Sequence, residues 1–400
     1  MSGRDYYCSC KFRIMKVDAE RKLTYNCDPA APKKIDFTWL EKNPGKLFNT
    51  PLVLEERQMM LENTRNSSCE QNCFKAEDVG AISPRILRQG YIKTHSDIIA
   101  EPELIDLTIG SDCNLSCSYC FKEYSSAWRH DLLTNGNYDT VKMDDDRFTI
   151  NFRDKVINRN SQPIRVKSNH FQLLLDEMQI LSKSLKTLII TGGEPLLNNS
   201  LFDILDKVSN VPDIKLFTGL GVDYKRFTKL VEKLKQYTNV WLSVSAESTE
   251  KNYEFNRYGN KWNEFVTKIE FLEKNNITFS FHSSLSNLTI LGLSEFYEKF
   301  ANRMSSYDLV YNPDFMAVYV LDDHTKQRVI DKLNTLDTSV TNWHRNHLSK
   351  EFIIQSMQVE PTQKQRDNIR EFLKEFTRRR PDLDVTLYPK EFLKWIDYVV

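Results

Sequence analysis

Apolar and polar residues alternate in short runs along the middle of the chain, and these runs predict six β-strands. The predicted strands span residues 104–109, 187–191, 215–218, 240–245, 278–283 and 309–320. Between them, apolar residues recur with helical spacing over 171–183, 201–208, 224–236, 262–274 and 294–303. Strands that alternate with helices are typical of a parallel sheet, so the sequence predicts an α/β fold. Ligands of such sheets bind at the carboxyl ends of the strands.

The regions around this pattern predict two further parts. Residues 1–100 precede the strands and contain five of the eight cysteines, so we expect a separate module there. Residues 101–320 form the predicted core. Within it, residues 121–166 are unusually long and polar for a loop, which indicates a lid or a substrate-specificity insertion. Residues 321–400 carry two helical patterns and are expected to pack on the core as a helical C-terminal extension.

Composition and charge narrow the class of protein. The 55 Lys and Arg residues balance 55 Asp and Glu residues, so no general attraction to nucleic acid or to an anionic membrane is expected. No apolar segment approaches the length of a membrane span, and the first residues lack the apolar region of a signal peptide. We therefore expect a cytoplasmic protein. Eight cysteines in that compartment indicate metal or redox chemistry and not a disulfide framework.

Three cysteines follow the first predicted strand within eight residues, namely Cys113, Cys117 and Cys120. Three thiolates can bind only three irons of a [4Fe-4S] cluster, which leaves one iron open, whereas electron-storage clusters normally have four protein thiolates. An open iron indicates chemistry on a bound substrate. A structural zinc site is the alternative, although the residues directly after Cys120 supply no fourth ligand with the usual spacing.

This C-x3-C-x-aromatic-C motif after a strand resembles the cluster motif of the radical S-adenosylmethionine (radical SAM) superfamily. The resemblance implies a partial (βα)6 barrel in which the amino and carboxylate groups of SAM chelate the open iron. It also implies that one electron, delivered by a reductant such as flavodoxin or ferredoxin, cleaves SAM to methionine and a 5′-deoxyadenosyl radical.

Four residues at the end of the second predicted strand, Gly192, Gly193, Glu194 and Pro195, are similar to the GGEP motif of this superfamily, which binds the SAM amino group. Glycine lets the backbone approach a ligand closely, and the carboxylate and carbonyl oxygens accept hydrogen bonds from an ammonium group. The setting at a strand end favours this interpretation over an ordinary turn.

Four other residues are expected to contact SAM. Tyr119 matches the aromatic position that packs beside adenine, with a core aromatic as the alternative. Ser243 and Ser245 share one face of the fourth predicted strand and are expected to reach the ribose or the carboxylate of SAM, or else to fill the barrel interior. Arg257 is expected to pair with the SAM carboxylate, with a solvated surface arginine as the alternative.

The N-terminal cysteines predict a second metal site. Their arrangement resembles the twitch-type module, a shortened SPASM domain found N-terminal to the barrel in a group of bacterial and phage radical SAM proteins, although the last pair is C-x3-C here and C-x2-C there. The resemblance implies an auxiliary [4Fe-4S] cluster on Cys8, Cys27, Cys69 and Cys73, with zinc as the alternative. Cys10 is expected on the same face of a strand as Cys8, as an alternate ligand or a buried thiol.

The sequence thus predicts a radical SAM enzyme that modifies or isomerises its substrate at an unactivated carbon. The favoured substrate is a nucleobase or a nucleotide-linked group, such as an amino-acid adduct on thymine in phage DNA. Arginines of the insertion and of the C-terminal extension are usable for phosphate contact: Arg129, Arg147, Arg153, Arg159, Arg165, Arg378, Arg379 and Arg380. A solvated surface is the other explanation of these charges. A peptide maturase and a non-catalytic metal-binding scaffold are the alternative functions.

Overall fold

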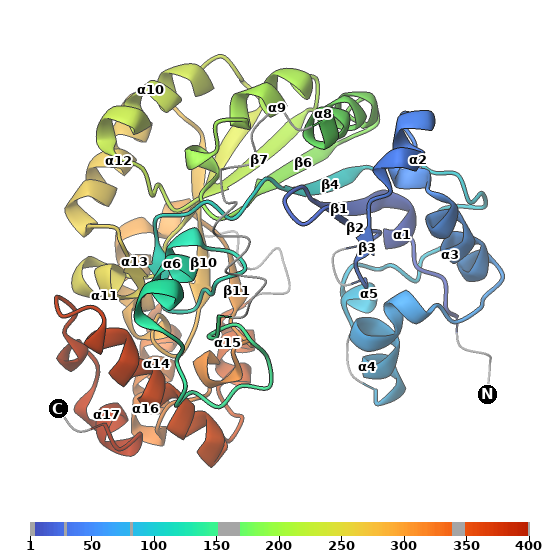
Figure 1. The fold of residues 1–400 in the computed structure, drawn as a ribbon. Coiled ribbons are helices and arrows are strands. Elements are labelled where there is room, and N and C mark those ends of the chain that lie inside the picture. The colour runs from blue at the N-terminus through green and yellow to red at the C-terminus, as the bar shows by residue number, and fades with distance from the viewer. Residues whose placement is uncertain (1–4, 28–29, 81–82, 151–168, 338–348, 399–400) are drawn as a thin grey trace. The chain divides into compact units, whose positions relative to one another are not determined.

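The computed structural model describes residues 5–27, 30–80, 83–150, 169–337 and 349–398. These residues form a mixed α/β fold with parallel strands (Figure 1). The chain divides into two compact units that interleave along the sequence: unit 1 comprises residues 1–110, 162–216 and 237–241, and unit 2 comprises residues 111–161, 217–236 and 242–400. The predicted domain boundaries near residues 100 and 320 stay predictions.

Unit 1 is built around a mixed sheet, whose strands follow the order β7-β6-β4-β1-β2-β3 in the described residues. The strands are β1 (Ile14–Asp18), β2 (Leu23–Tyr25), β3 (Lys33–Lys34), β4 (Leu104–Thr108), β6 (Thr187–Thr191) and β7 (Asp213–Thr218), the last ending just inside unit 2. β1, β4, β6 and β7 are parallel, and β2 and β3 continue the sheet in antiparallel pairs. Alternate residues of β4 and β6 are buried, as the apolar alternation predicted.

Short helices surround the strands of unit 1. They are α1 (Cys10–Arg13), α2 (Phe37–Lys42), α3 (Pro51–Leu61), α4 (Lys75–Asp78), α5 (Pro84–Leu87), α8 (Asn169–Leu181) and α9 (Leu201–Lys207). Single turns lie at Leu47–Asn49, Ser67–Cys69, Glu70–Phe74 and Pro195–Leu197. The buried Arg57 of α3 ties several segments together, because its guanidinium donates to the carbonyl oxygens of Lys11, at 2.9 Å, and Phe48, at 3.0 Å. These bonds satisfy carbonyls that no helix or strand pairs.

Unit 2 contains three parallel strands in the order β11-β10-β8, among the residues described. They are β8 (Val240–Ser245), β10 (Phe279–Leu285) and β11 (Met304–Leu309), and a separate ribbon pairs β5 (Ser116–Cys117) with β9 (Arg257–Tyr258). The helices are α6 (Ser126–Asn135), α10 (Tyr224–Leu234), α11 (Glu250–Asn256), α12 (Trp262–Lys274), α13 (Leu293–Phe300), α14 (Asp323–Thr335), α15 (Lys350–Ser356), α16 (Gln363–Arg378) and α17 (Lys390–Trp395). Single turns lie at Ile290–Gly292, Ala301–Arg303, Asp314–Met316 and Val385–Leu387.

Three local predictions from the sequence need correction. The sixth strand is β11, so the prediction over 309–320 was wrong. That segment is irregular with one turn at Asp314–Met316; its residues 315–318 are buried, whereas Tyr311 is 55% exposed. Cys10 opens α1 and does not lie on a strand, so the argument that it shares a strand face with Cys8 was also wrong. The insertion is more than a loop, because it contains α6, and its residues 151–166 lie outside the described part.

The C-terminal extension shares a core with the insertion. The buried Trp128 of α6 lies 5.8 Å from Phe376 of α16 between ring centroids, and Tyr138 lies 5.7 Å from Phe372. Burying these large rings is a strong stabilising term, about 1.5–3 kcal/mol for each side chain. We infer that the two segments fold together.

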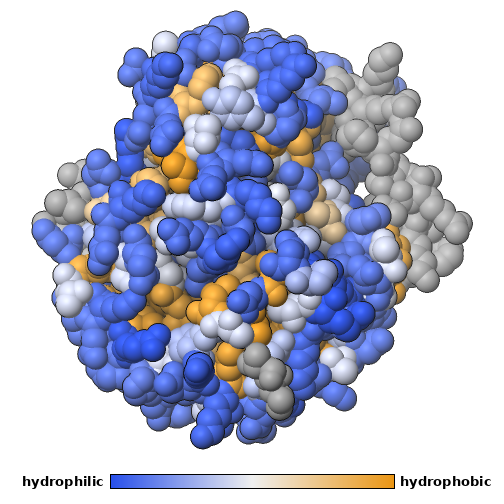
Figure 2. All heavy atoms as spheres, turned by 90° about the vertical axis from the view of Figure 1, so that its left-hand side faces the viewer, coloured by the Kyte–Doolittle hydropathy of each residue, from blue (hydrophilic) through white to orange (hydrophobic). Residues whose placement is uncertain are grey.

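The face of the molecule in Figure 2 is covered mainly by hydrophilic side chains, with apolar residues in small groups between them. No helix in the described ranges is long and apolar enough to cross a membrane.

Candidate active site and metal-binding cysteines

The three cysteines of the strand-end motif lie in a loop of unit 2 that hydrogen bonds fix at several points. Cys117 lies in β5 and pairs across the ribbon with Arg257 of β9. The indole Nε1 of Trp128 donates to the carbonyl oxygen of Cys117 at 2.9 Å, and the backbone N–H of Cys113 donates to Ser126 Oγ at 2.9 Å. Cys117 is buried, while the other two cysteines are half-buried. The loop therefore holds its thiols on a backbone that is anchored on both sides.

The thiols of this loop suit a soft metal but are protonated by default. Burial raises the pKa of the Cys117 thiol to about 11 and that of Cys120 to about 12. A thiol must lose its proton to bind iron, so metal binding here would release protons. In the described ranges no group of three or more Cys, His, Asp or Glu side chains is placed to hold a metal ion. Ligation by Cys113, Cys117 and Cys120 thus stays a prediction, which the donor chemistry and spacing support.

A buried hydrogen-bonded network lies directly behind the loop. Tyr119 donates its hydroxyl proton to Glu247 Oε1 at 3.0 Å, and the Arg257 guanidinium pairs with Glu247 Oε2 at 2.7 Å. The guanidinium also lies 5.7 Å from the centre of the Tyr119 ring, at cation–π distance. Burial opposes the charge of Arg257, but Glu247 raises the pKa of that guanidinium well above its usual range. The network orients the aromatic residue that precedes Cys120.

Glu247 was missed by the sequence analysis, although a signal existed. It follows β8 by two residues, at the strand end where ligand-facing groups gather, and it is fully buried. A buried carboxylate requires a cation, and Arg257 was the nearby candidate. The structure gives Arg257 this internal partner, so its expected contact with the SAM carboxylate stays a prediction.

The Gly192-Gly193-Glu194-Pro195 turn follows β6 in unit 1 and packs tightly against the end of β4. Gly192 has φ +157°, and a Cβ atom there would lie 2.7 Å from the carbonyl oxygen of Gly110, so no larger residue fits. The N–H of Gly193 donates to the same oxygen at 2.9 Å. Glu194 is buried, and its Oε1 accepts from the N–H of Leu196 at 3.1 Å as a helix cap. The glycines are thus required by packing, and binding of the SAM amino group stays a prediction.

The two serines of β8 differ in environment. Ser243 is fully buried, and its Oγ has no hydrogen-bond partner in the part of the chain that the structure describes. Ser245 is half-buried one step further along the same face of the strand. An unsatisfied buried hydroxyl is costly, which is consistent with a ligand that the hydroxyl would contact.

Four N-terminal cysteines line one small cavity of unit 1. They are the four residues predicted as auxiliary ligands, Cys8, Cys27, Cys69 and Cys73, and each is buried. Cys8 precedes α1, Cys27 follows the β1–β2 hairpin, and the other two flank the turn after α3. Four soft thiols around one closed space are the donor set of a structural iron–sulfur or zinc site. Their placement does not test whether these cysteines bind a metal.

Cationic side chains surround this cavity. Lys11 and Arg85 line it together with the cysteines. Lys11 is fully buried and pairs with Glu56 at 2.5 Å, and Arg85 forms a two-point ion pair with Glu77. Arg88 Nη1 approaches the Cys27 sulfur at 4.0 Å. Burial raises the pKa of the Cys69 thiol, and that of Cys73 to about 11, and Lys11 opposes the shift at Cys69 because a cation stabilises a thiolate.

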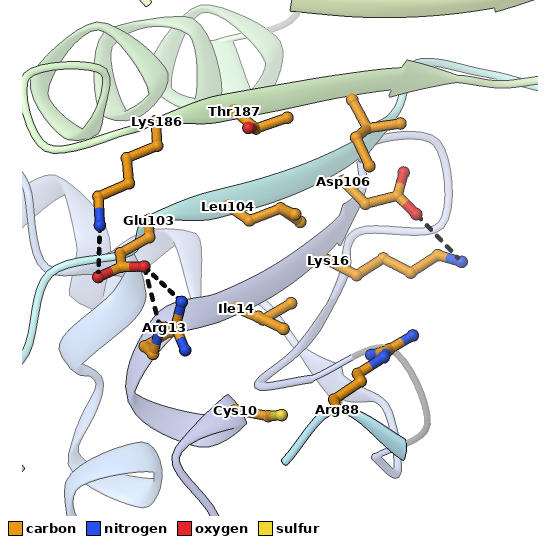
Figure 3. Close-up of a pocket in the computed structure, with 11 residues that line it drawn as sticks. Cys10, Arg13, Ile14, Lys16, Arg88, Glu103, Leu104, Asp106, Lys186 and Thr187 are labelled. Carbon is orange, nitrogen blue, oxygen red and sulfur yellow. Dashed lines mark hydrogen bonds and ion pairs between the residues drawn. The ribbon is translucent and has the colours of Figure 1, made fainter. Parts of the chain in front are cut away.

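Cys10 does not line the four-cysteine cavity and instead faces a larger one (Figure 3). A hydrogen bond with the Cys27 thiol is the main cause that raises the pKa of Cys10 to about 11. Cys10 also hydrogen-bonds with Cys8. Cys10 therefore lies beside two predicted ligands but lines a different cavity.

The arginines predicted to contact phosphates are mostly structural. Arg379 and Arg380 are buried and share Asp131 at 3.2 and 3.4 Å. Arg147 is 8% exposed, pairs with Asp145 at 2.6 Å and stacks on a phenylalanine ring. A guanidinium that is buried and paired cannot reach a phosphate, so that prediction was wrong for these three residues.

Two more of these arginines are engaged in unit 2. Arg129 is 8% exposed and donates to Ser111 Oγ at 3.0 Å, so the phosphate prediction was wrong for it too. Arg378 is exposed and pairs with Glu375 at 2.6 Å. Arg153, Arg159 and Arg165 lie outside the described residues.

Solved structures of low sequence identity resemble the chain. anSMEcpe with bound AdoMet is 15% identical with a TM-score of 0.33, and the match covers 51% of this chain and 49% of that chain. Streptococcus suis SuiB bound to precursor peptide SuiA is 12% identical with a TM-score of 0.34, covering 81% of this chain and 69% of that chain. The match therefore spans about half the length of the first structure. No curated protein matches the chain.

The radical SAM superfamily matches residues 107–302. This range contains the three strand-end cysteines, the double-glycine turn and the Glu247–Arg257 pair described above. It also contains all the parallel strands from β6 to β10. Residues 107–302, just under half of the chain, thus resemble the radical SAM superfamily, a family of enzymes.

Proposed function

We propose that the protein binds a [4Fe-4S] cluster on Cys113, Cys117 and Cys120 and uses it to cleave SAM reductively. The observation that carries this proposal is the three-thiol loop, anchored at β5 and α6 within the matched domain. When bound and reduced, the cluster and SAM together supply a 5′-deoxyadenosyl radical, which abstracts hydrogen from an unactivated carbon of the substrate.

The residues of the chain bind and orient in this proposal. Three thiolates hold the cluster and leave one position open. Glu247 and Arg257 hold Tyr119 in place next to the cluster loop, and the buried hydroxyl of Ser243 is available to a ligand. Gly192 lets the turn after β6 pack closely on Gly110, which positions Glu194 at the end of the strand. These contacts supply geometry and exclusion of water, while the cofactors supply the difficult chemical step.

The substrate is the less constrained part of the proposal. A nucleobase-linked substrate was the first choice from sequence, but four of the arginines that motivated it are buried in unit 2. Peptide maturation is the second candidate, and a non-catalytic metal scaffold the third. An intact three-thiol loop favours catalysis over a scaffold, since a scaffold needs no open iron.

The test compares two neighbouring buried residues of β5. After anaerobic reconstitution and reduction, Cys117→Ala should produce no 5′-deoxyadenosine above background, because one of three ligands is lost. Ser116→Ala removes only a hydroxyl group from the adjacent position. This variant should form 5′-deoxyadenosine at a rate within about threefold of the wild type, equivalent to about 0.7 kcal/mol. Production by Cys117→Ala at the wild-type rate would contradict the proposal.

A further inference from the structure

A cavity of about 520 Å³ on one face of the sheet of unit 1 has no role in the proposed function (Figure 3). Two rows of side chains from β1, β4 and β6 form its floor. In register across the three strands, the first row is Ile14, Leu104 and Thr187, and the second is Lys16, Asp106 and Ile189. The first row is mainly apolar, and the second contains the ion pair of Lys16 and Asp106 at 3.7 Å, so the floor combines apolar and charged side chains.

The cavity lies at the beginning of the strands. Arg13, Glu103 and Lys186, which line its rim, each directly precede a strand, whereas the double-glycine turn follows the end of β6. A strand rises about 3.3 Å per residue, so five residues of β6 separate the two ends by more than about 10 Å. The lining is therefore centred on the strand starts and extends to Asp106 and Ile189 in the middle of β4 and β6, where Asp106 accepts a hydrogen bond from Thr191 at the end of β6.

Cationic side chains outnumber carboxylates in the lining. Four of the lining residues carry a positive charge and two carry a carboxylate. One carboxylate, that of Glu103, serves two cations, with Arg13 at 2.8 Å and Lys186 at 3.1 Å. Burial favours the neutral acid, but these two cations outweigh it and lower the pKa of Glu103. Glu103 is thus ionised at neutral pH, and the lining still has a positive excess.

The remaining wall brings the cavity next to the four-cysteine site. It consists of Cys10 and Arg88. Arg88 Nη1 lies 4.0 Å from the Cys27 sulfur, and the Cys10 thiol hydrogen-bonds with Cys27 and Cys8. A ligand in the cavity would touch side chains that contact two of the predicted auxiliary ligands.

We propose that this cavity binds a small organic anion, whose carboxylate or phosphate group is held by Arg88 and Arg13 and whose apolar body lies on Ile14 and Leu104. Arginine offers paired N–H donors that match both groups. The volume suits a small molecule and is too small for a folded partner. The proposal concerns binding alone and does not depend on SAM cleavage.

The test is calorimetric titration of the reconstituted full-length protein with phenyl phosphate, phenylacetate and phenethylamine. At least one of the two anions should bind with one-to-one stoichiometry, and the amine of similar size should not. The tighter anion distinguishes a phosphate from a carboxylate ligand. Arg88→Gln should weaken anion binding at least about tenfold, equivalent to about 1.4 kcal/mol.

Two further variants complete the test. Thr187→Phe fills the cavity without changing its charge and should also abolish anion binding. Lys42→Gln neutralises an exposed cation of α2 outside the cavity and should leave the affinity unchanged. Thermal unfolding verifies that each variant is folded. If the Arg88→Gln variant does not fold, the Thr187→Phe variant alone tests the proposal. The proposal is overturned if the amine binds as tightly as the anions, if neither anion binds the folded protein at millimolar concentration, or if a folded Thr187→Phe variant binds like the wild type.

Discussion

The two groups of cysteines differ in how completely the protein encloses them. The N-terminal group of unit 1 consists of four buried thiols around one small cavity with Lys11 and Arg85. The strand-end group of unit 2 consists of three thiols on one loop, and two of them are half-buried. The ion pair of Glu247 and Arg257, which has no net charge, lies behind this loop. A closed set of four suits a metal that stays fully ligated, and an anchored set of three suits one that must bind something else. The two groups thus differ in enclosure and in the number of thiols, and this difference is what the predictions below test.

The largest expected effect is the change in iron content and in deoxyadenosine formation when one cysteine of either group is replaced. The reconstituted wild type should hold about eight irons, the sum of two four-iron clusters. Cys73→Ala should lower this to about four and retain deoxyadenosine formation without substrate, because the strand-end loop is intact. Cys117→Ala should lose that formation. A wild-type protein with four irons and one zinc would mean that the N-terminal cysteines bind zinc and not an auxiliary cluster.

The next effect concerns the support behind the strand-end loop. Glu247→Ala leaves the Arg257 guanidinium buried without its carboxylate and frees the Tyr119 hydroxyl, so we expect the free energy of unfolding to fall by about 3 kcal/mol. Urea unfolding measures this. The double variant Glu247→Gln with Arg257→Met should lose less, because no unpaired charge remains. Equal loss in the two variants would mean that the network acts through packing alone.

The smallest effect is a pH dependence at the four-cysteine cavity. Burial opposes ionisation of Glu56, but Lys11 at 2.5 Å and Lys33 at 3.0 Å outweigh it and lower the pKa of Glu56 below its usual 4.5. A lowered carboxyl pKa stabilises the fold above the unfolded pKa, and this stability is lost as pH falls through the folded one. Glu56→Gln should therefore flatten the decline in unfolding free energy below about pH 4.5. If the unfolding free energy of the variant declines as steeply as that of the wild type, other carboxyl groups cause the loss of stability at low pH.

The sequence was a good guide wherever a pattern is local. The strands β4, β6 and β8 appear where the apolar pattern predicted them, and β4 and β6 bury every second residue, whereas β8 also buries three successive residues, 242–244. The four N-terminal cysteines that the resemblance grouped together line one cavity although they are spread over many residues, and periodicity alone would not have grouped them.

Other features depend on tertiary contacts that no local pattern encodes. The apolar run at 315–321 is buried as an irregular segment, since an apolar run alone does not distinguish a strand from other buried chain. Arg380 is charged in sequence and buried in the fold, because Asp131 and three aromatic rings surround it. Glu247 was missed because its partner Arg257 lies at the far end of α11, not at a helical spacing from it.

The ribbon of β5 and β9 has a consequence for biosynthesis. It anchors Cys117 to Arg257, and the adjacent Ser118 and Asn256 bond across 138 positions of the chain. On the ribosome, the strand-end loop stays without its anchor until that distant segment has emerged. The four N-terminal cysteines all precede residue 74 and need no such wait. The anchor of the strand-end loop is therefore complete only after residues 256–258 have been synthesised, whereas the four N-terminal cysteines are all present once residue 73 has been.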